Sequence, residues 1–264
     1  MITAYLFVMG LVWGSFLNVV IYRIAHGESP IKGRSVCPNC KKTISWKYNI
    51  PLLSFLYLKG RCVNCHKKIS WQYPIVEMGT GVLFIWWFVI GRSFFLLADQ
   101  PWSFIQPLFW LVIGMLFVTI FMADLLFGII PDSVNLAIFC LSLTYRLSLV
   151  ATGNMQFNDF LRAIAAGVIL TLFFGFLWWI TKGRGFGPGD VKLAPALGLL
   201  LGWPKTLIAV FSAFVLGSLI GVMLLVVGKK RFGQTLPFGP FLVIGSVVAL
   251  LWGGRLWGWY AGLL

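Results

Sequence analysis

The chain has 264 residues, of which 59% are hydrophobic and only 11% are charged, and its mean hydropathy is +0.91. This composition excludes an ordinary soluble domain, because such domains do not carry so many long apolar stretches. The formal net charge of +14 needs no nucleic-acid partner, since a basic inner face beside anionic membrane lipid accounts for it.

Long apolar segments recur along the chain, and most are long enough to cross the hydrocarbon core as helices. A crossing helix needs roughly 20 apolar residues, and membrane strands would alternate between polar and apolar positions. An additional segment, 193–202, is short. The sequence therefore predicts an all-α polytopic membrane protein with about eight transmembrane helices. The full-length candidates are residues 4–22, 75–91, 107–123, 133–151, 160–181, 206–228 and 241–261.

The basic residues predict an orientation. The loop from Arg23 to Lys68 carries ten of the 21 Lys and Arg residues, and cytoplasmic loops are enriched in these residues. With this loop inside, the first apolar run starts outside, and the lack of a basic residue before it argues against a cleaved signal peptide. The short segment 193–202 is needed to carry the chain outward between Lys192 and Lys205.

The loop 26–73 contains two CxxC pairs, "CPNC" and "CVNC". Four thiolates in such pairs suit a tetrahedral structural zinc ion. The alternative is two disulfides, which a reducing cytosol and the short spacing within each pair disfavour. His66 is expected beside the site, and the lone Cys140 is expected to be a small buried hydrophobe. The expected zinc ligands are Cys37, Cys40, Cys62 and Cys65.

Most of the seven acidic residues have simple explanations. Glu28 and Asp99 fall in loops and need no function. Asp159 is predicted to be the N-cap of the fifth span. Asp132, which follows Pro131 at the start of the fourth span, is also interpreted as an N-cap, although a contribution to a site stays open.

Two acids, Asp124 in "MADLLFGIIPD" and Asp190 in "GFGPGDVKL", are expected near the cytoplasmic boundary beside apolar helices. Acids at membrane depth are costly and usually functional. If the two carboxylates meet in a low-dielectric pocket, one keeps its proton and the other can activate water, as in an aspartic protease. The alternatives for Asp190 are an N-cap and a phosphate cradle, and the absence of a nucleotide fingerprint disfavours the cradle.

The loop before Asp190 is rich in glycine, which suits a backbone that approaches a neighbour or a substrate closely. Its glycines are Gly185, Gly187 and Gly189. Lys192 lies two residues after Asp190, so on a helix it would not face that carboxylate, and we expect it to reach toward the membrane interface.

These residues carry a resemblance to a known family. "GFGPGDVKL" resembles the GxGD signature of intramembrane aspartyl proteases, and "DLLFGIIPD" resembles the first aspartate motif of type IV prepilin peptidases. "GSFLNVVIYR" at 14–23, the CxxC pairs and "YPIVE" at 73–77 resemble the N-terminal half of the bacterial bifunctional branch, which combines leader peptidase and N-methyltransferase activities. The resemblance runs from about Gly14 to Leu193.

The resemblance implies a multi-pass enzyme of the bacterial cytoplasmic membrane, with the cysteine loop and the catalytic residues on the cytoplasmic side. Such enzymes cleave the basic leader of prepilins or pseudopilins after a glycine and then methylate the new amino terminus with S-adenosylmethionine. Their catalytic aspartates match Asp124 and Asp190. The sequence departs from the family pattern at Leu126, where many relatives have a polar or acidic residue, and at Pro188, where a bulky residue is common.

A division of labour follows from the resemblance. Residues 1–103 are expected to form the methyltransferase part, and residues 104–264 a six-helix protease core. Glu77 is a candidate for methyl transfer or for holding the new amino terminus; its alternative is a structural partner of a basic residue such as Arg23. Asn18 and Arg23 are candidates for the same role as Glu77.

Three other function classes fit the sequence less well. A transporter would also place acids among its spans, but it would show symmetric halves, and the cysteine loop has no counterpart in the second half. A membrane assembly factor would keep the zinc loop but would not need both aspartates. An unrelated zinc hydrolase would need an open metal position, and no HExxH motif is present.

Overall fold

The computed structural model describes residues 1–30, 32–91, 101–183, 185–229 and 236–263. Asp99 and the basic residues Arg184, Lys230 and Arg231 lie outside the described residues. Within the described part the fold is helical, and the only β-type pairings are two isolated bridges in the cysteine loop. The chain forms two compact units, Met1–Thr119 and Ile120–Leu264, and α5 (Trp102–Phe127) passes from one to the other.

The first unit is built on two helices, α1 (Ile2–Ala25) and α3 (Gln72–Trp86), which pack against each other. Small residues on α1 allow the close approach, since a Cβ on Gly14 would lie 2.6 Å from the Cα of Glu77. The helix α3 continues into a π-helical turn, η2 (Trp87–Gly91). The loop between α1 and α3 contains two short helices, η1 (Trp46–Tyr48) and α2 (Leu53–Tyr57).

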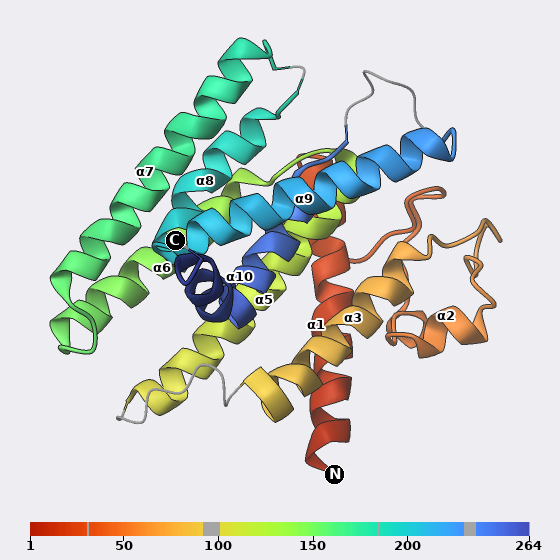
Figure 1. The fold of residues 1–264 in the computed structure, drawn as a ribbon. Helices are drawn as coiled ribbons and strands as arrows, with labels where there is room; N and C mark the ends of the chain where they lie inside the picture. Colours follow the sequence, from red (N-terminus) through yellow and green to blue (C-terminus); the bar gives the residue numbers. More distant parts are fainter. Residues whose placement is uncertain (31, 92–100, 184, 230–235, 264) are drawn as a thin grey trace. The chain divides into compact units, whose positions relative to one another are not determined.

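The second unit packs a short buried helix among longer ones. The helix α8 (Pro188–Leu201) lies against α6 (Asp132–Ala151) and α7 (Phe157–Ile180), as Figure 1 shows. A Cβ on Gly198 of α8 would overlap the backbone of Gly167 on α7, so glycine sets this close contact. The remaining helices, α9 (Lys205–Val226) and α10 (Gly239–Ala261), pack against each other.

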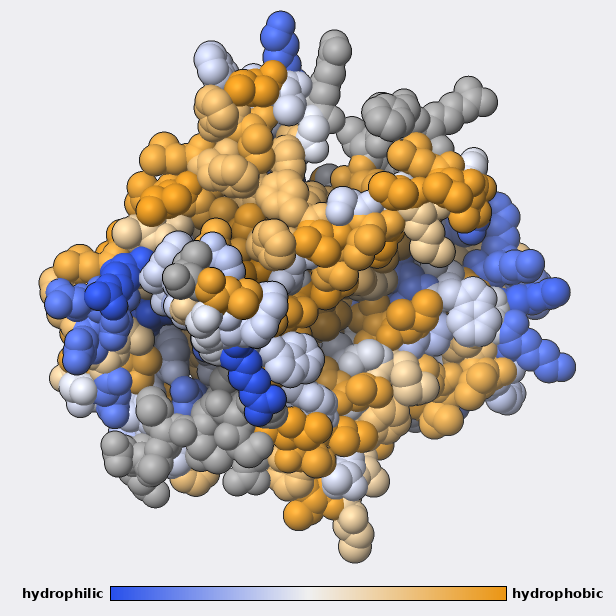
Figure 2. Space-filling view, in the orientation of Figure 1, coloured by the Kyte–Doolittle hydropathy of each residue, from blue (hydrophilic) through white to orange (hydrophobic). Residues whose placement is uncertain are grey.

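The described part contains seven helices that are long and apolar enough to cross a membrane. Each coincides with one of the seven full-length segments expected from the sequence. Figure 2 shows a mainly hydrophobic surface, with hydrophilic side chains gathered at the right, over the segment that carries α2, and also at the left of the view. The seven are Ile2–Ala25, Gln72–Gly91, Trp102–Phe127, Asp132–Ala151, Phe157–Ile180, Lys205–Val226 and Gly239–Ala261.

The short segment expected at 193–202 is the second half of α8, which has 14 residues. At 1.5 Å per residue such a helix is about 21 Å long, shorter than the roughly 30 Å hydrocarbon core. Its C-terminal end is capped by a charged side chain. Arg146 of α6 is buried and donates hydrogen bonds to the carbonyl groups of Leu199 and Leu200. A cation suits the end of a helix, where carbonyl groups lack intrahelical donors.

Two expectations about individual residues are wrong. Cys140 is exposed on α6 and is not a buried hydrophobe. Asp159 is not the N-cap of α7; Gln156 holds that position, and Asp159 lies in the first turn and pairs with Arg162 at 3.4 Å. A carboxylate in the first turn still interacts favourably with the helix dipole. The expectation of an acidic residue at the start of this helix is therefore met, but not at the N-cap position.

Candidate active site and metal centre

Asp124 lies in the last turn of α5 and its side chain is buried. Its Oδ2 accepts a hydrogen bond from the backbone N–H of Gly239, the first residue of α10, at 2.8 Å. A Cβ on Gly239 would lie only 2.7 Å from this oxygen, so the close contact requires glycine. The first N–H groups of a helix lack intrahelical acceptors and favour negative charge. The N-terminus of α10 therefore holds the Asp124 carboxylate.

Asp190 is the third residue of α8 and is also buried. It is not the N-cap, which is Gly187; instead its Oδ2 accepts a hydrogen bond from the Gly187 N–H at 3.2 Å. Its Oδ1 is buried and has no hydrogen-bond partner in the protein. Buried polar atoms nearly always have a partner, so this oxygen is available to a proton or to a substrate group.

The two carboxylates influence each other. Asp190 precedes the buried part of α8 and lies outside the seven candidate spans. Burial, followed by the negative charge of Asp124, raises the pKa of Asp190 to about 7, against a smaller opposing effect of the Gly187 N–H. Asp190 therefore keeps a proton up to about neutral pH. A pair in which one carboxyl is neutral and the other ionised can perform general acid–base chemistry.

The glycines of the loop before Asp190 differ in how tightly they are packed. A Cβ on Gly189 would lie 3.0 Å from the Cβ of Ile130, in the segment that follows α5. At Gly185 the nearest atom is the Cγ2 of Thr181 at 3.1 Å, whereas Gly187 has only an ordinary contact, with Asp190 Oδ2 at 3.6 Å. The close backbone approach expected for this loop is thus strongest at Gly189.

An aromatic cluster joins the two sides of the site. Phe186, in the glycine-rich loop, packs against Phe238, which directly precedes Gly239, with ring centroids 5.2 Å apart. Both rings also pack against Phe174 and Phe214. The loop that leads to Asp190 and the turn that holds Asp124 therefore share one packed cluster. The sequence predicted no site residue in the last two spans. The signal that was available is "PFGPF" at 237–241, which places a glycine between prolines at a helix start.

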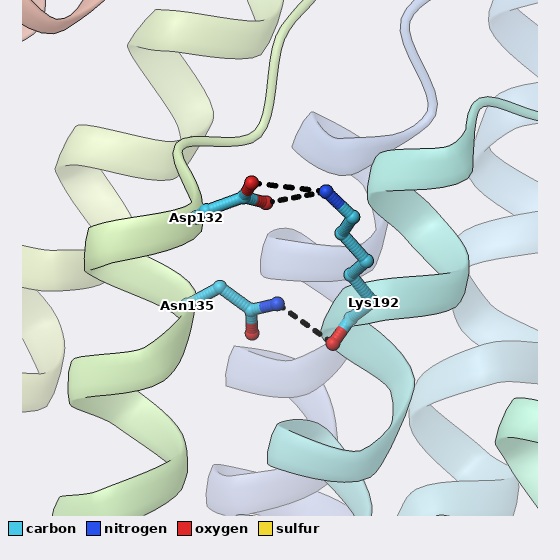
Figure 3. Close-up of polar contacts among 3 residues, drawn as sticks. All are labelled: Asp132, Asn135 and Lys192. Atoms are coloured by element: carbon cyan, nitrogen blue, oxygen red, sulfur yellow. Dashed lines mark hydrogen bonds and ion pairs between the residues drawn. The ribbon is translucent and has the colours of Figure 1, made fainter.

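The sequence suggested that Lys192 extends toward the membrane interface, but in the structure its side chain is paired. Its Nζ lies 2.9 Å from both carboxylate oxygens of Asp132 (Figure 3). Asp132 is the first helical residue of α6, and Pro131 is the N-cap, so the N-cap interpretation of Asp132 is wrong. The Nδ2 of Asn135 also donates a hydrogen bond to the backbone oxygen of Lys192, at 2.7 Å. The structure thus gives Asp132 a partner on α8.

The four paired cysteines come together in the first unit as free thiols, so the disulfide alternative is not formed. Their Sγ atoms all lie within 4.8 Å of one another, and those of Cys37 and Cys65 are 3.9 Å apart. Zinc–sulfur bonds of about 2.3 Å in a tetrahedron place sulfur atoms about 3.8 Å apart, so the geometry fits zinc. The Asn39 side chain donates to Cys65 Sγ and lowers the pKa of that thiol to about 6, which favours the thiolate that a metal needs.

The two CxxC segments form an internal repeat, which was not among the features predicted from the sequence. "CPNCKKTISW" at 37–46 and "CVNCHKKISW" at 62–71 are identical at seven of ten positions. Both fold alike, since the N–H of the first cysteine donates to the carbonyl of Lys42 in one copy and of Lys67 in the other. His66 is equivalent to Lys41, and both have a φ of 56°. The histidine therefore occupies a turn position beside the cluster.

Two of the three candidates for methyl transfer, Glu77 and Arg23, hold backbone of the cysteine loop, and Asn18 holds the start of α3. Glu77 is buried, and its Oε2 accepts a hydrogen bond from the Leu52 N–H at 2.8 Å. Asn18 donates to the carbonyl oxygen of Tyr73 at 3.1 Å. The guanidinium of Arg23 donates to loop carbonyls, including those of Ser29, Pro30 and Arg34. These contacts make each side chain part of the framework that carries the four cysteines.

Comparisons with known proteins give two family matches in separate parts of the chain. A model of the bacterial peptidase A24 N-terminal domain matches residues 8–90, and a model of the type IV leader peptidase family matches residues 110–222. The prepilin leader peptidase/N-methyltransferase of Aeromonas salmonicida (strain A449) is 31% identical over 96% of this chain and 92% of its own length. The chain belongs to the type IV leader peptidase family. No solved structure gives a significant match.

Two further relatives carry the same description, prepilin leader peptidase/N-methyltransferase. The protein of Legionella pneumophila is 33% identical over 94% of this chain and 91% of its own length. That of Bacillus subtilis (strain 168) is 33% identical over 97% of this chain and 96% of its own length. The leader peptidase match contains Asp124 and Asp190 but ends before Gly239, so α10 completes the site from outside the matched region.

The metal centre gives a direct prediction. Purified protein should contain about one zinc per chain, and the double substitution Cys37→Ser/Cys62→Ser should remove it, because two thiolates cannot complete a tetrahedral site. Metal analysis after removal of loosely bound ions measures this. The matched control is Cys140→Ser, which should retain the metal. Metal-free protein with four titratable thiols in the native state would contradict the assignment.

Proposed function

We propose that this protein removes the basic leader of prepilins or pseudopilins after a glycine and then N-methylates the new amino terminus. The observation that carries the cleavage activity is the pair of buried carboxylates, Asp124 and Asp190, each held by backbone N–H groups at the start of a helix. Membership of the type IV leader peptidase family supports the same substrate class. A transporter or an assembly factor has no comparable support.

The arrangement suggests a role for each carboxyl group. Asp124, which accepts the Gly239 N–H, serves as the ionised base that takes a proton from water as the water attacks the scissile carbonyl carbon. Asp190, neutral at pH values up to about 7, donates a hydrogen bond to the carbonyl oxygen. When the tetrahedral intermediate collapses, the C–N bond breaks, and the proton that Asp124 took from water passes to the leaving amine, which restores the ionised carboxylate.

The location of the site suits the substrate. In a prepilin the basic leader stays in the cytosol and the apolar helix enters the membrane, so their junction lies at the cytoplasmic boundary. The topology we propose has the N-terminus outside and places both the cysteine loop and the two aspartates on that side, in the bacterial cytoplasmic membrane. The mainly hydrophobic outer face in Figure 2 suits a substrate that enters sideways from the lipid.

The first part of the chain, residues 1–103, is assigned to methyl transfer. S-adenosylmethionine would supply the methyl group there, and zinc would hold the cysteine loop together. Glu77 is buried between α1 and the loop, where a carboxylate can orient an ammonium group and accept its proton before methylation. Asn18 supports this region by binding a carbonyl at the start of α3, and Arg23 by binding loop carbonyls.

Cleavage should depend on both aspartates. Asp124→Asn and Asp190→Asn should each reduce cleavage of a purified prepilin to background, because the amide keeps the shape but cannot cycle a proton. Product mass reports the cleavage, and zinc content reports that the protein is intact. Asp159→Asn, on the exposed start of α7, should cleave normally. An active Asp124→Asn variant would show that the first catalytic acid was wrongly assigned.

Methylation should be separable from cleavage. Glu77→Gln should leave cleavage largely intact while the cleaved pilin stays unmethylated, since the amide cannot accept the ammonium proton. With S-adenosylmethionine present, one methyl group adds about 14 mass units to the product, which distinguishes the two outcomes. Fully methylated product, or joint loss of both activities with loss of the folded protein, would show that Glu77 serves only the framework of the loop.

A further inference from the structure

Lys192, two residues after Asp190 on α8, makes polar contacts with two side chains of α6. We propose that Asp132, Asn135 and Lys192 are positioning residues that hold Asp190 in place for leader cleavage. This inference rests on the proposed function, and it adds three side chains that touch neither water nor substrate in the cleavage step.

Lys192 is held at both ends. Its ammonium group lies 2.9 Å from each carboxylate oxygen of Asp132, while its backbone oxygen accepts the Asn135 amide at 2.7 Å. Asp132 and Asn135 are three residues apart on α6, so their side chains lie on the same face of that helix, as Figure 3 shows. The side chain and the backbone of Lys192, two residues after Asp190, are thus both held by the same face of α6.

The Asn135 contact lies next to a weak point in α8. Pro195 lies inside the helix and has no N–H, so the carbonyl group of Val191 loses its intrahelical donor and the preceding turn is crowded. Lys192 belongs to that turn. Asn135 is only 8% exposed, and its amide donates to the next carbonyl group along the chain, that of Lys192, from a neighbouring helix. The turn that presents Asp190 is therefore held from outside rather than by α8 alone.

The same contacts tie Asp190 to the segment that carries the other carboxylate. The helix α6 begins shortly after Asp124, and Ile130 lies between them in sequence. Ile130 packs so closely against Gly189 that a Cβ there would lie 3.0 Å away. Ile130 and α6 thus contact α8 on both sides of Asp190 in sequence. A displacement of about 1 Å in such a site can lower a rate roughly a hundredfold, so these contacts can set the cleavage rate.

The ion pair is suited to positioning rather than to stabilising the whole protein. The side chains of Lys192 and Asp132 are 56% and 72% exposed, and exposed pairs typically add little to the free energy of unfolding. The described residues contain a matched pair, Asp159–Arg162, with side chains 50% and 68% exposed at 3.4 Å. That pair lies near the start of α7, whereas Thr181, which contacts the glycine-rich loop, follows the end of this helix. The control pair is therefore at the opposite end of α7 from the loop that leads to Asp190.

The test is a double-mutant cycle on full-length protein with a purified prepilin. Asp132→Asn and Lys192→Met should each lower kcat about tenfold with little change in KM, because Asp190 is displaced while the substrate still binds. The double variant should be no slower than either single one, since both act through one ion pair. Lys192→Arg should keep the wild-type kcat, and Asn135→Ala should lower it. Methylation of already cleaved pilin should be unchanged in every variant.

The control cycle uses Asp159→Asn and Arg162→Met, which should leave kcat unchanged. A wild-type kcat in Asp132→Asn beside a slow Lys192→Met would mean that Lys192 acts alone, and would overturn the proposal. Losses that multiply in the double variant would overturn it as well. If a variant fails to fold, the comparison of Lys192→Arg with Asn135→Ala decides the question. Absence of cleavage by the unmodified protein would instead refute the proposed function.

Discussion

The second unit depends on one constraint, the burial of two carboxylates close enough to affect each other's charge. Asp124 and Asp190 are 6% and 5% exposed. Each is held by a backbone N–H at the start of a helix, α10 for Asp124 and α8 for Asp190. Helix starts favour negative charge, which offsets part of the cost of removing a carboxylate from water. The short α8, the glycines and the phenylalanine cluster together bring these helix starts to the end of α5.

The features that the sequence revealed are those with a local signature. Span length follows from apolar composition, and the two acids and four cysteines lie in motifs whose residues are adjacent in the chain. The "PFGPF" segment marks Gly239 as part of a helix start, but its contact with Asp124 could not be found this way, because it joins residues 115 apart. The Lys192–Asp132 pair joins residues 60 apart for the same reason. Such contacts depend on how helices pack, which composition does not determine.

The errors in detail have physical explanations. Asp132 has the residue type of an N-cap, but Pro131 takes that position, so the carboxylate is free to bind Lys192. Cys140 is apolar enough to be buried, yet it is exposed. In a membrane protein the residues that face lipid are as apolar as those in the core, so hydrophobicity does not separate inside from outside.

The first unit shows how a basic loop with few apolar residues acquires a fixed structure. Two copies of one cysteine turn place four thiolates around a common centre, and metal binding there would contribute directly to folding. Glu77 on α3 and Arg23 on α1 secure the loop backbone. The two activities we propose thus fall on units with separate polar frameworks, which is why substitutions in one should leave the other intact.

The central claim is that a neutral Asp190 works beside an ionised Asp124, and the pH dependence of kcat/KM for prepilin cleavage tests it most directly. The raised pKa means that Asp190 is protonated below about pH 7 and loses its proton as the pH rises through that value. The account predicts that kcat/KM falls above about pH 7, approaching a tenfold loss per pH unit, while the protein stays folded. A kcat/KM that is constant from about pH 6.5 to about pH 9 would contradict it.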